Sequence, residues 1–225
     1  MCGRFGLVAD SEGVLDYFWF DPSSVQYKQR YNVAPTDPVL TYGAQGPRTA
    51  EYMRWGLIPY WSKPGGRKLP LAINARAETI ATHGMFKWPF QRRRCLVLSD
   101  GFYEWQKSDD GAVTPYRIGL ASWEVFGFAG LWDEWHGPDG TVRSCTIITT
   151  EPNELIEPIH DRMPVLLPPD AHEEWLDGDN RDVDALRRLL VPYPSDAMEA
   201  YEVGKAVGDV KNDTPDVIQL VSRLL

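Results

Sequence analysis

Alternation of apolar and polar side chains predicts a protein built mainly from β-strands. Residues 142–150 are rich in β-branched side chains, residues 95–99 are mostly apolar, and residues 51–59 alternate aromatic with polar positions. Residues 101–105 are expected to continue as a second strand, followed by a turn at 108–111. Further strands are expected at residues 3–8, 39–42, 115–118, 125–132, 165–167, 198–203 and 217–221.

Helices are expected to be short. Ser11 is positioned to cap a helix that includes Trp19. Another short helix is expected to begin near Glu78. Asp170 and Asp182 are positioned to cap two helices nearer the C-terminus.

The predicted elements follow one another without an internal repeat, a low-complexity linker or a clear boundary. Residues 30–36 are expected to form a compact loop, because Pro35 holds the residue before it in an extended conformation. The pattern therefore predicts one α+β domain over residues 1–225, with mainly antiparallel sheet.

The composition is ordinary for a globular protein, with 43% hydrophobic and 24% charged residues. The chain has no run of about eighteen apolar residues, and its first residues lack the pattern of a signal peptide, so no membrane partner is expected. The three cysteines, Cys2, Cys95 and Cys145, form no Cys-x-x-Cys pair. This argues against a disulfide framework and for a reducing compartment.

Charge is distributed unevenly, although the net charge is −9. Residues 1–107 carry 14 Lys and Arg against 9 Asp and Glu, whereas residues 108–225 carry 9 against 23. A local basic face binds phosphates even when the total charge is acidic. The run Arg92-Arg93-Arg94 within this half is expected to be a solvated face.

A predicted loop at 60–68 combines aromatic rings with cations. Its members are Tyr60, Trp61, Lys63, Arg67 and Lys68. This mixture suits single-stranded nucleic acid, whose bases stack on rings and whose phosphates need countercharge. A role for Trp61 as a half-buried cover over the core is an equal alternative.

Several familiar sites are excluded by pattern. The chain has no G-x-x-x-x-G-K-[ST], G-x-G-x-x-G or G-x-S-x-G motif. Its four histidines, His83, His136, His160 and His172, do not pair at metal-ligand spacing, and His172 is expected on a helix surface. We therefore expect neither a metal nor a cofactor.

Cys2 is the first candidate for chemistry. If Met1 is removed, Cys2 carries a thiol and a free α-amine on adjacent carbons. The amine condenses with an aldehyde to give an imine, and the thiol then closes a five-membered thiazolidine ring on the same carbon. The ordinary pKa values, roughly 7.7–8.0 for the amine and roughly 8.5 for the thiol, leave both a reactive fraction near neutral pH.

A second set of candidates consists of polar residues flanked by apolar strand or by proline. Glu104 lies between aromatic residues, where ionisation is costly and the pKa of its carboxyl should rise, as suits a general acid or base. Each member also has an ordinary structural explanation, such as an ion pair between Arg162 and Asp161. The full set is Asn74, Arg76, Glu78, Glu104, His160 and Arg162.

Six stretches of the chain carry a resemblance to a known family. They are Met1-Cys2-Gly3-Arg4-Phe5, Arg30-Tyr31-Asn32-Val33-Ala34-Pro35, Arg54-Trp55-Gly56-Leu57-Ile58-Pro59, Asn74-Ala75-Arg76-Ala77-Glu78-Thr79, Gly101-Phe102-Tyr103-Glu104-Trp105 and His160-Asp161-Arg162-Met163-Pro164, with a weaker match at 206–212. In this order, over nearly the whole chain, they resemble the SOS response-associated peptidase (SRAP) family of abasic-site processing proteins.

The resemblance implies a fold, an activity and a partner. The family fold is a single α+β domain whose antiparallel strands form an open barrel with short flanking helices. Its members bind single-stranded DNA and join the residue that matches Cys2 covalently to the aldehyde of an abasic site. A thiol autopeptidase activity that exposes this cysteine has also been proposed. We expect a cytoplasmic monomer that associates with the nucleoid during DNA damage, if the source is bacterial or archaeal.

The resemblance also implies residue roles by position. Cys2 would be the nucleophile, Asn74 would orient it, and Glu104 and His160 would transfer protons. The DNA-binding residues would be Arg4, Arg76 and Arg162 at phosphates, Trp61 and Met85 beneath splayed bases, and Thr149 at the end of a strand.

Two other functions fit parts of the sequence. Cys2 followed by glycine and phenylalanine also resembles the start of class II glutamine amidotransferases, in which a processed cysteine attacks an amide. That function leaves residues 101–105 and 160–164 without a role. A non-covalent module for binding single strands, with a structural Cys2, is the other alternative.

Overall fold

Five strands pair in a ring that forms a small barrel. They are β10 (Gly140–Thr150), β4 (Ala50–Trp55), β3 (Pro38–Tyr42), β6 (Arg94–Ser99) and β9 (Phe126–Gly137), and β9 pairs back with β10. This computed structural model describes residues 2–18, 25–44, 46, 49–66 and 69–221. All pairings in the ring are antiparallel except that of β10 with β4. The expected α+β barrel of mainly antiparallel strands is confirmed.

Three short strands extend the barrel at its rim. β5 (Asn74–Arg76) runs parallel to β10, β11 (Met163–Pro164) is antiparallel to the end of β10, and β12 (Leu166–Leu167) pairs with β9. These pairings bring residues 74–76 and 163–164 together at the C-terminal end of β10, although they are far apart in sequence. Two of the stretches that carry the family resemblance therefore meet at one edge.

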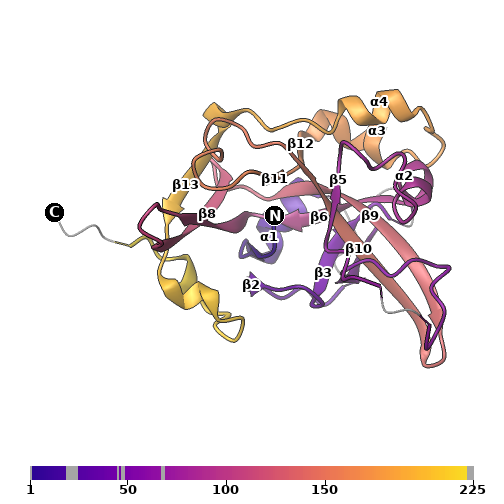
Figure 1. Ribbon diagram of the computed structural model, residues 1–225, viewed down its shortest axis with the longest axis horizontal. Helices are drawn as coiled ribbons and strands as arrows, with labels where there is room; N and C mark the ends of the chain where they lie inside the picture. The colour runs from indigo at the N-terminus through magenta and orange to yellow at the C-terminus, as the bar shows by residue number, and fades with distance from the viewer. Residues whose placement is uncertain (1, 19–24, 45, 47–48, 67–68, 222–225) are drawn as a thin grey trace.

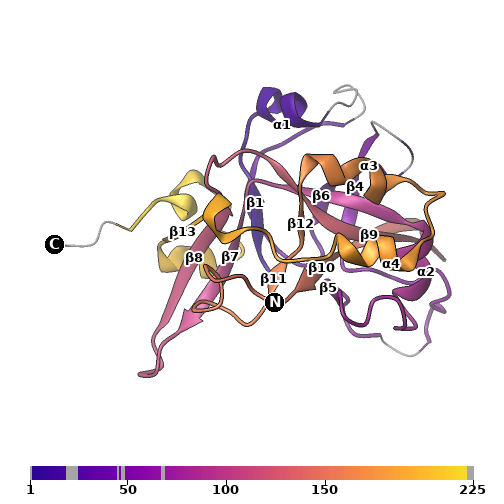
Figure 2. The ribbon, with the colours of Figure 1, turned by 90° about the horizontal axis from the view of Figure 1, so that it is seen from above.

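A second sheet lies beside the barrel (Figures 1 and 2). Its order is β13 (Met198–Glu202), β8 (Val113–Leu120), β7 (Gly101–Lys107), β1 (Phe5–Leu7) and β2 (Arg30–Val33). The described residues also form short α-helices, which are α1 (Ser11–Tyr17), α2 (Lys87–Arg92), α3 (His172–Leu176) and α4 (Val183–Arg188). Short 3₁₀-helices span Pro169–Ala171, Ser195–Ala197, Lys205–Gly208 and Pro215–Ile218. In the described part of the chain, no helix has the length and apolar character needed to cross a membrane.

The period-two pattern of the strands divides the core into two parts. In β6, Cys95 and Val97 join a cluster that includes Phe5 and Phe102 of the second sheet. Their neighbours Leu96 and Leu98 point to the opposite face of the strand, where helices cover the barrel. The continuous apolar run at 95–99 is therefore explained by burial on both faces.

Several local predictions were wrong because long-range partners decide the conformation. Residues 30–33 form strand β2 instead of a loop, since β2 pairs with β1 and the Asp213 carboxylate accepts the N–H groups of Tyr31 and Asn32. Residues 217–221 do not form a strand. They contribute a 3₁₀-turn and a single bridge between Val203 and Leu220.

Helix ends also differ from the predictions. Asp10, not Ser11, caps α1 by accepting the Gly13 N–H, and Trp19 lies outside the described residues. Asp182 caps α4 as predicted. Asp170 makes no cap and lies inside a 3₁₀-turn. The segment after Glu78 forms turns, and the helix begins only at residue 87.

The arginine run is a solvated face only at Arg92, which is exposed. Arg94 is only 4% exposed and donates to backbone carbonyls of Phe90, Trp175 and the loop after α3. Arg93 pairs with the buried Asp133. His172 is likewise half-buried, stacked on Phe18. Fold-stabilising contacts, not solvent, hold these charged side chains.

Candidate active site

Strand pairing brings Cys2 next to Glu104. β1 pairs antiparallel with β7, with Phe5 opposite Phe102, and the Tyr103 N–H donates to the Arg4 carbonyl. Continuing this register places Gly3 opposite Glu104. Cys2 is fully buried, and burial together with the nearby Glu104 charge raises the pKa of its thiol. The thiol is therefore protonated at neutral pH and needs a proton acceptor before it can act as a nucleophile.

Glu104 has the electrostatic properties of such an acceptor. Glu104 is 3% exposed, and burial raises the pKa of its carboxyl to about 7. The predicted direction of the pKa shift is confirmed. A carboxyl with a pKa near neutrality populates both protonation states, so it can accept a proton in one step and return it in another.

His160 completes the group. Its Nε2 lies 3.9 Å from the Glu104 Oε2, and its Nδ1 accepts the Arg162 backbone N–H at 3.0 Å. The Asp161 Oδ1 lies 2.9 Å from the same Nδ1, so a carboxylate faces each nitrogen of the ring. Burial lowers the pKa of His160, which favours the neutral ring. A cavity of about 500 Å³ borders His160, Asp161 and Trp105.

Asn74 is placed at the rim by β5. Its register partner on β10 is Ile147. Both the amide nitrogen and the amide oxygen are shielded from solvent and have no hydrogen-bond partner among the described residues. A shielded amide without partners is costly, which is a feature of functional positions.

The residues expected to bind DNA differ in how far they are exposed. Arg76 is exposed on β5, and Trp61 is 47% exposed in its loop. Met85 and Thr149 are buried, at 9% and 0% exposure. Two basic members of that loop, Arg67 and Lys68, and Met1 with its expected removal, lie outside the described residues.

Two of the predicted arginines already have protein partners. Arg162 binds the Glu78 carboxylate with both terminal nitrogens, at 2.6 and 3.0 Å, and not Asp161. It also donates to the Thr149 carbonyl at 2.7 Å. Arg4 donates to the Asn32 Oδ1 and to the Val207 carbonyl, each at 2.8 Å.

Asn32 is a site residue that the sequence analysis missed. It is fully buried, accepts from Arg4, and donates to the carbonyls of Val207, Asp209 and Asn212. It thus fastens the C-terminal segment behind Arg4. A signal was present, since Asn32 lies between apolar Tyr31 and Val33, the same pattern that singled out Asn74.

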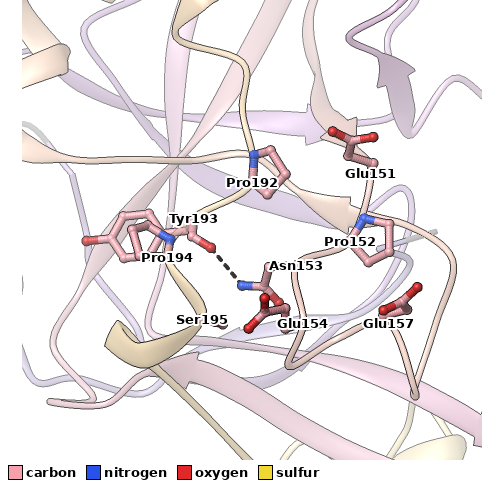
Figure 3. A pocket seen from close by; sticks show the side chains of 9 residues that line it. All are labelled: Glu151, Pro152, Asn153, Glu154, Glu157, Pro192, Tyr193, Pro194 and Ser195. Atoms are coloured by element: carbon pink, nitrogen blue, oxygen red, sulfur yellow. Dashed lines mark hydrogen bonds between the residues drawn. The ribbon is translucent and has the colours of Figure 1, made fainter.

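A further surface cavity of about 470 Å³ shares Pro152 and Glu157 with the cavity beside His160 and has acidic walls (Figure 3). Its lining includes Glu151, Glu154 and Glu157 with three prolines and Tyr193, and Asn153 donates to the Tyr193 carbonyl. None of the predicted catalytic residues lines it. No group of three or more His, Cys, Asp or Glu residues arranged to hold a metal ion occurs in the described ranges.

Comparison with known proteins places these residues in a family. The family model described as SOS response associated peptidase (SRAP) matches residues 1–210. The chain belongs to the SRAP family. Abasic site processing protein YoqW of Bacillus subtilis is 44% identical, with 97% of this chain and 99% of YoqW covered. Abasic site processing protein HMCES of Xenopus tropicalis is 31% identical, with 90% of this chain and 69% of HMCES covered.

Solved structures share the SRAP-family fold. A protein from Bacteroides thetaiotaomicron superimposes with a TM-score of 0.83 at 24% identity, covering 97% of this chain and 98% of that one. This likeness concerns the fold alone. A phage-related protein from Bordetella bronchiseptica gives a TM-score of 0.71 at 30% identity, covering 96% of this chain and all of the other.

Proposed function

We propose that this SRAP-family chain processes abasic sites by binding single-stranded DNA and linking Cys2 covalently to the abasic-site aldehyde. The observation that carries the proposal is the position of Glu104, whose carboxyl has a pKa of about 7 and lies beside both Cys2 and His160. Relatives covering nearly the whole chain are named abasic site processing proteins, which supports the same substrate.

The chemistry begins with opening of the abasic sugar. In the closed sugar, the anomeric carbon is bonded to the ring oxygen. Cleavage of that bond requires a proton on the ring oxygen, which the protonated His160 ring supplies and thereby becomes neutral, while the anomeric hydroxyl passes its proton to the Glu104 carboxylate and becomes the aldehyde. The α-amine of mature Cys2 then attacks the aldehyde carbon. The Glu104 carboxyl returns its proton to the departing oxygen, and loss of one water gives a protonated imine.

Ring closure uses the thiol. The Cys2 S–H proton passes to the Glu104 carboxylate, sulfur bonds to the carbon of the protonated imine, and the C=N electron pair moves onto the nitrogen, which becomes the ring amine. The product is a thiazolidine. The conversion of the aldehyde into this ring releases one water. Asn74 has a donor and an acceptor available to orient the reacting groups, because its amide has no partner among the described residues.

DNA binding is assigned to the basic and aromatic residues around this group. Arg4, Arg76 and Arg162 bind phosphates without reading sequence. Trp61, which is 47% exposed, offers a ring on which a base stacks, and Met85, which is 9% exposed, lies beneath a splayed base. Thr149 is 0% exposed and acts on the strand through Arg162, which donates to its carbonyl. The protein acts as a monomer in this scheme, and the domain extends over residues 1–225.

The direct test uses mature protein and a single-stranded oligonucleotide with one abasic site, resolved on a denaturing gel. We expect a heat-stable shifted band. The matched control is the same chain with an N-terminal extension before Cys2, which has no free α-amine at Cys2. Mass spectrometry shows whether the extension stays, in which case no band should form, or is removed by the chain itself, which would reveal autopeptidase activity. Glutamine hydrolysis without a band would support the amidotransferase instead.

Glu104→Gln is expected to slow adduct formation about 100-fold, since general acid–base groups contribute typically 10²–10⁴-fold. The wild-type rate should rise between pH 6 and pH 8 as the carboxyl, with its pKa of about 7, loses its proton, and the variant should lack this rise. The control is Glu157→Gln, an exposed carboxyl beside the same cavity. An unchanged pH profile in Glu104→Gln would contradict the role of Glu104.

Glu104 should also influence stability with a definite sign. Its folded pKa is raised, so the folded state binds more protons than the unfolded state between about pH 4.5 and pH 7. Wild-type stability should therefore fall as pH rises through this window. Chemical denaturation should show a smaller fall in Glu104→Gln.

A further inference from the structure

Protein groups engage both terminal nitrogens of the Arg162 guanidinium. Glu78 binds its two terminal nitrogens in a two-pronged contact, and the Thr149 carbonyl accepts from one of them. The remaining Nε is shielded from solvent and has no hydrogen-bond partner among the described residues. A phosphate therefore cannot make a two-pronged contact with Arg162 while Glu78 is in place.

We propose that Glu78 competes with a DNA phosphate for Arg162 and stands in for that phosphate in the free protein. This inference rests on the proposed function, because it concerns the same DNA-binding surface. A carboxylate and a phosphate present paired oxygens to the guanidinium fork in the same way, so one replaces the other without a new arginine geometry. Glu78 thereby sets how tightly the protein holds a strand.

Arg162 and Glu78 differ in how far they are buried, and this difference favours replacement of Glu78 by a phosphate. The Arg162 side chain is 15% exposed and stays anchored by the Thr149 carbonyl when the carboxylate leaves. The Glu78 side chain is 50% exposed and lies on the turn after β5. In this exchange the Glu78 carboxylate moves away. Arg162 keeps the position in which it would bind a phosphate.

Glu78 also affects a second cation. The pKa of the Glu78 carboxyl is lowered, mainly by the hydrogen bonds from Arg162 and also by the charge of Arg76. Arg76 is exposed and makes no ion pair within the described ranges. A negative charge between two arginines weakens the attraction of both for a phosphate. Removing it should strengthen binding of any single strand, whether or not it holds an abasic site.

The test measures binding of a fluorescein-labelled, undamaged oligothymidine by anisotropy, with Cys2→Ala in every protein to prevent covalent reaction. Glu78→Gln should bind roughly three- to fivefold more tightly than its parent, in line with the upper range for an exposed pair. The slope of log affinity against log salt should steepen by about 0.7, the value for one additional phosphate contact on a single strand.

Two controls separate competition from a change in total charge. Glu51→Gln removes the same charge from another carboxylate that binds an arginine, Arg143 at 3.0 Å, and should leave affinity unchanged. Combining Glu78→Gln with Arg162→Gln should cancel the gain. Equal or weaker binding by Glu78→Gln, while its parent binds, would overturn the competition and identify Glu78 as a residue that positions Arg162. If neither protein binds the strand, the proposed function fails together with the inference.

Discussion

Replacing Cys2 by serine should abolish the heat-stable adduct with an abasic site. Serine keeps the α-amine and nearly the same shape at this fully buried position, so the imine can still form. The serine hydroxyl is a far weaker nucleophile than a thiolate, so the ring that makes the adduct persist should not close. We expect at least about a 100-fold loss of the heat-stable band, which is comparable to removing a general base.

Borohydride distinguishes the two halves of this reaction. Reduction converts an imine into a stable amine, so Cys2→Ser should give a covalent band when borohydride is present and none when it is absent. Cys95→Ala is the matched control, because it removes another fully buried thiol from the same core cluster and should keep the adduct. A heat-stable band from Cys2→Ser without borohydride would show that the thiol is not the ring-closing group.

The strands were predictable where local pattern and tertiary packing agree. Residues 95–99 are apolar because β6 is buried on both faces, and β10 is rich in β-branched residues at the centre of the barrel. Asp182 caps α4 through its own neighbours, so its role was visible in the sequence. Residues 30–33 form a strand because they pair with β1 and because Asp213, about 180 residues later, accepts the N–H groups of Tyr31 and Asn32. No local signal reports such partners.

In the candidate site, too, local features were predictable from the sequence and contacts between distant residues were not. The raised pKa of Glu104 was predictable in direction, although its main cause is burial in the fold and not the aromatic residues next to it in sequence. The contact of Arg162 with Glu78 was not, because 84 residues separate them and Asp161 is a more obvious local partner. Likewise, Asn32 holds Arg4 through strand pairing that sequence alone does not reveal. Individual chemical environments can be derived from sequence, whereas the pairing of charges depends on the fold.

A buried ion pair anchors the segment after β1, the strand that follows Cys2 in the chain. Arg117 and Asp100 meet at 2.8 Å with side chains 5% and 2% exposed. The same carboxylate accepts the N–H groups of Val8 and Ala9, both at 2.6 Å, just beyond β1. Arg117 also lies over the Trp123 ring, 4.5 Å from its centre. The pair therefore connects β8 to the segment that leaves β1.

Arg117→Met should lower the free energy of unfolding by about 3–5 kcal/mol at pH 8, because it leaves a buried carboxylate without its countercharge. The double variant Asp100→Asn/Arg117→Met should recover most of this loss, since the asparagine oxygen still accepts both N–H groups without a charge. Burial already raises the pKa of Asp100, and loss of Arg117 raises it further. The folded single variant then binds an additional proton as pH falls, so its deficit should shrink from pH 8 to pH 5.

Chemical denaturation at the two pH values, combined with adduct formation per folded molecule, tests the link to function. If the pair holds β1 in register with β7, Arg117→Met should form the adduct more slowly even at temperatures where it remains folded, because Cys2 no longer stays beside Glu104. The double variant should regain both stability and rate, since the N–H acceptors after β1 are restored. Recovery of stability without recovery of rate would show that the position of Cys2 depends on Arg117 itself and not on the anchoring of β1.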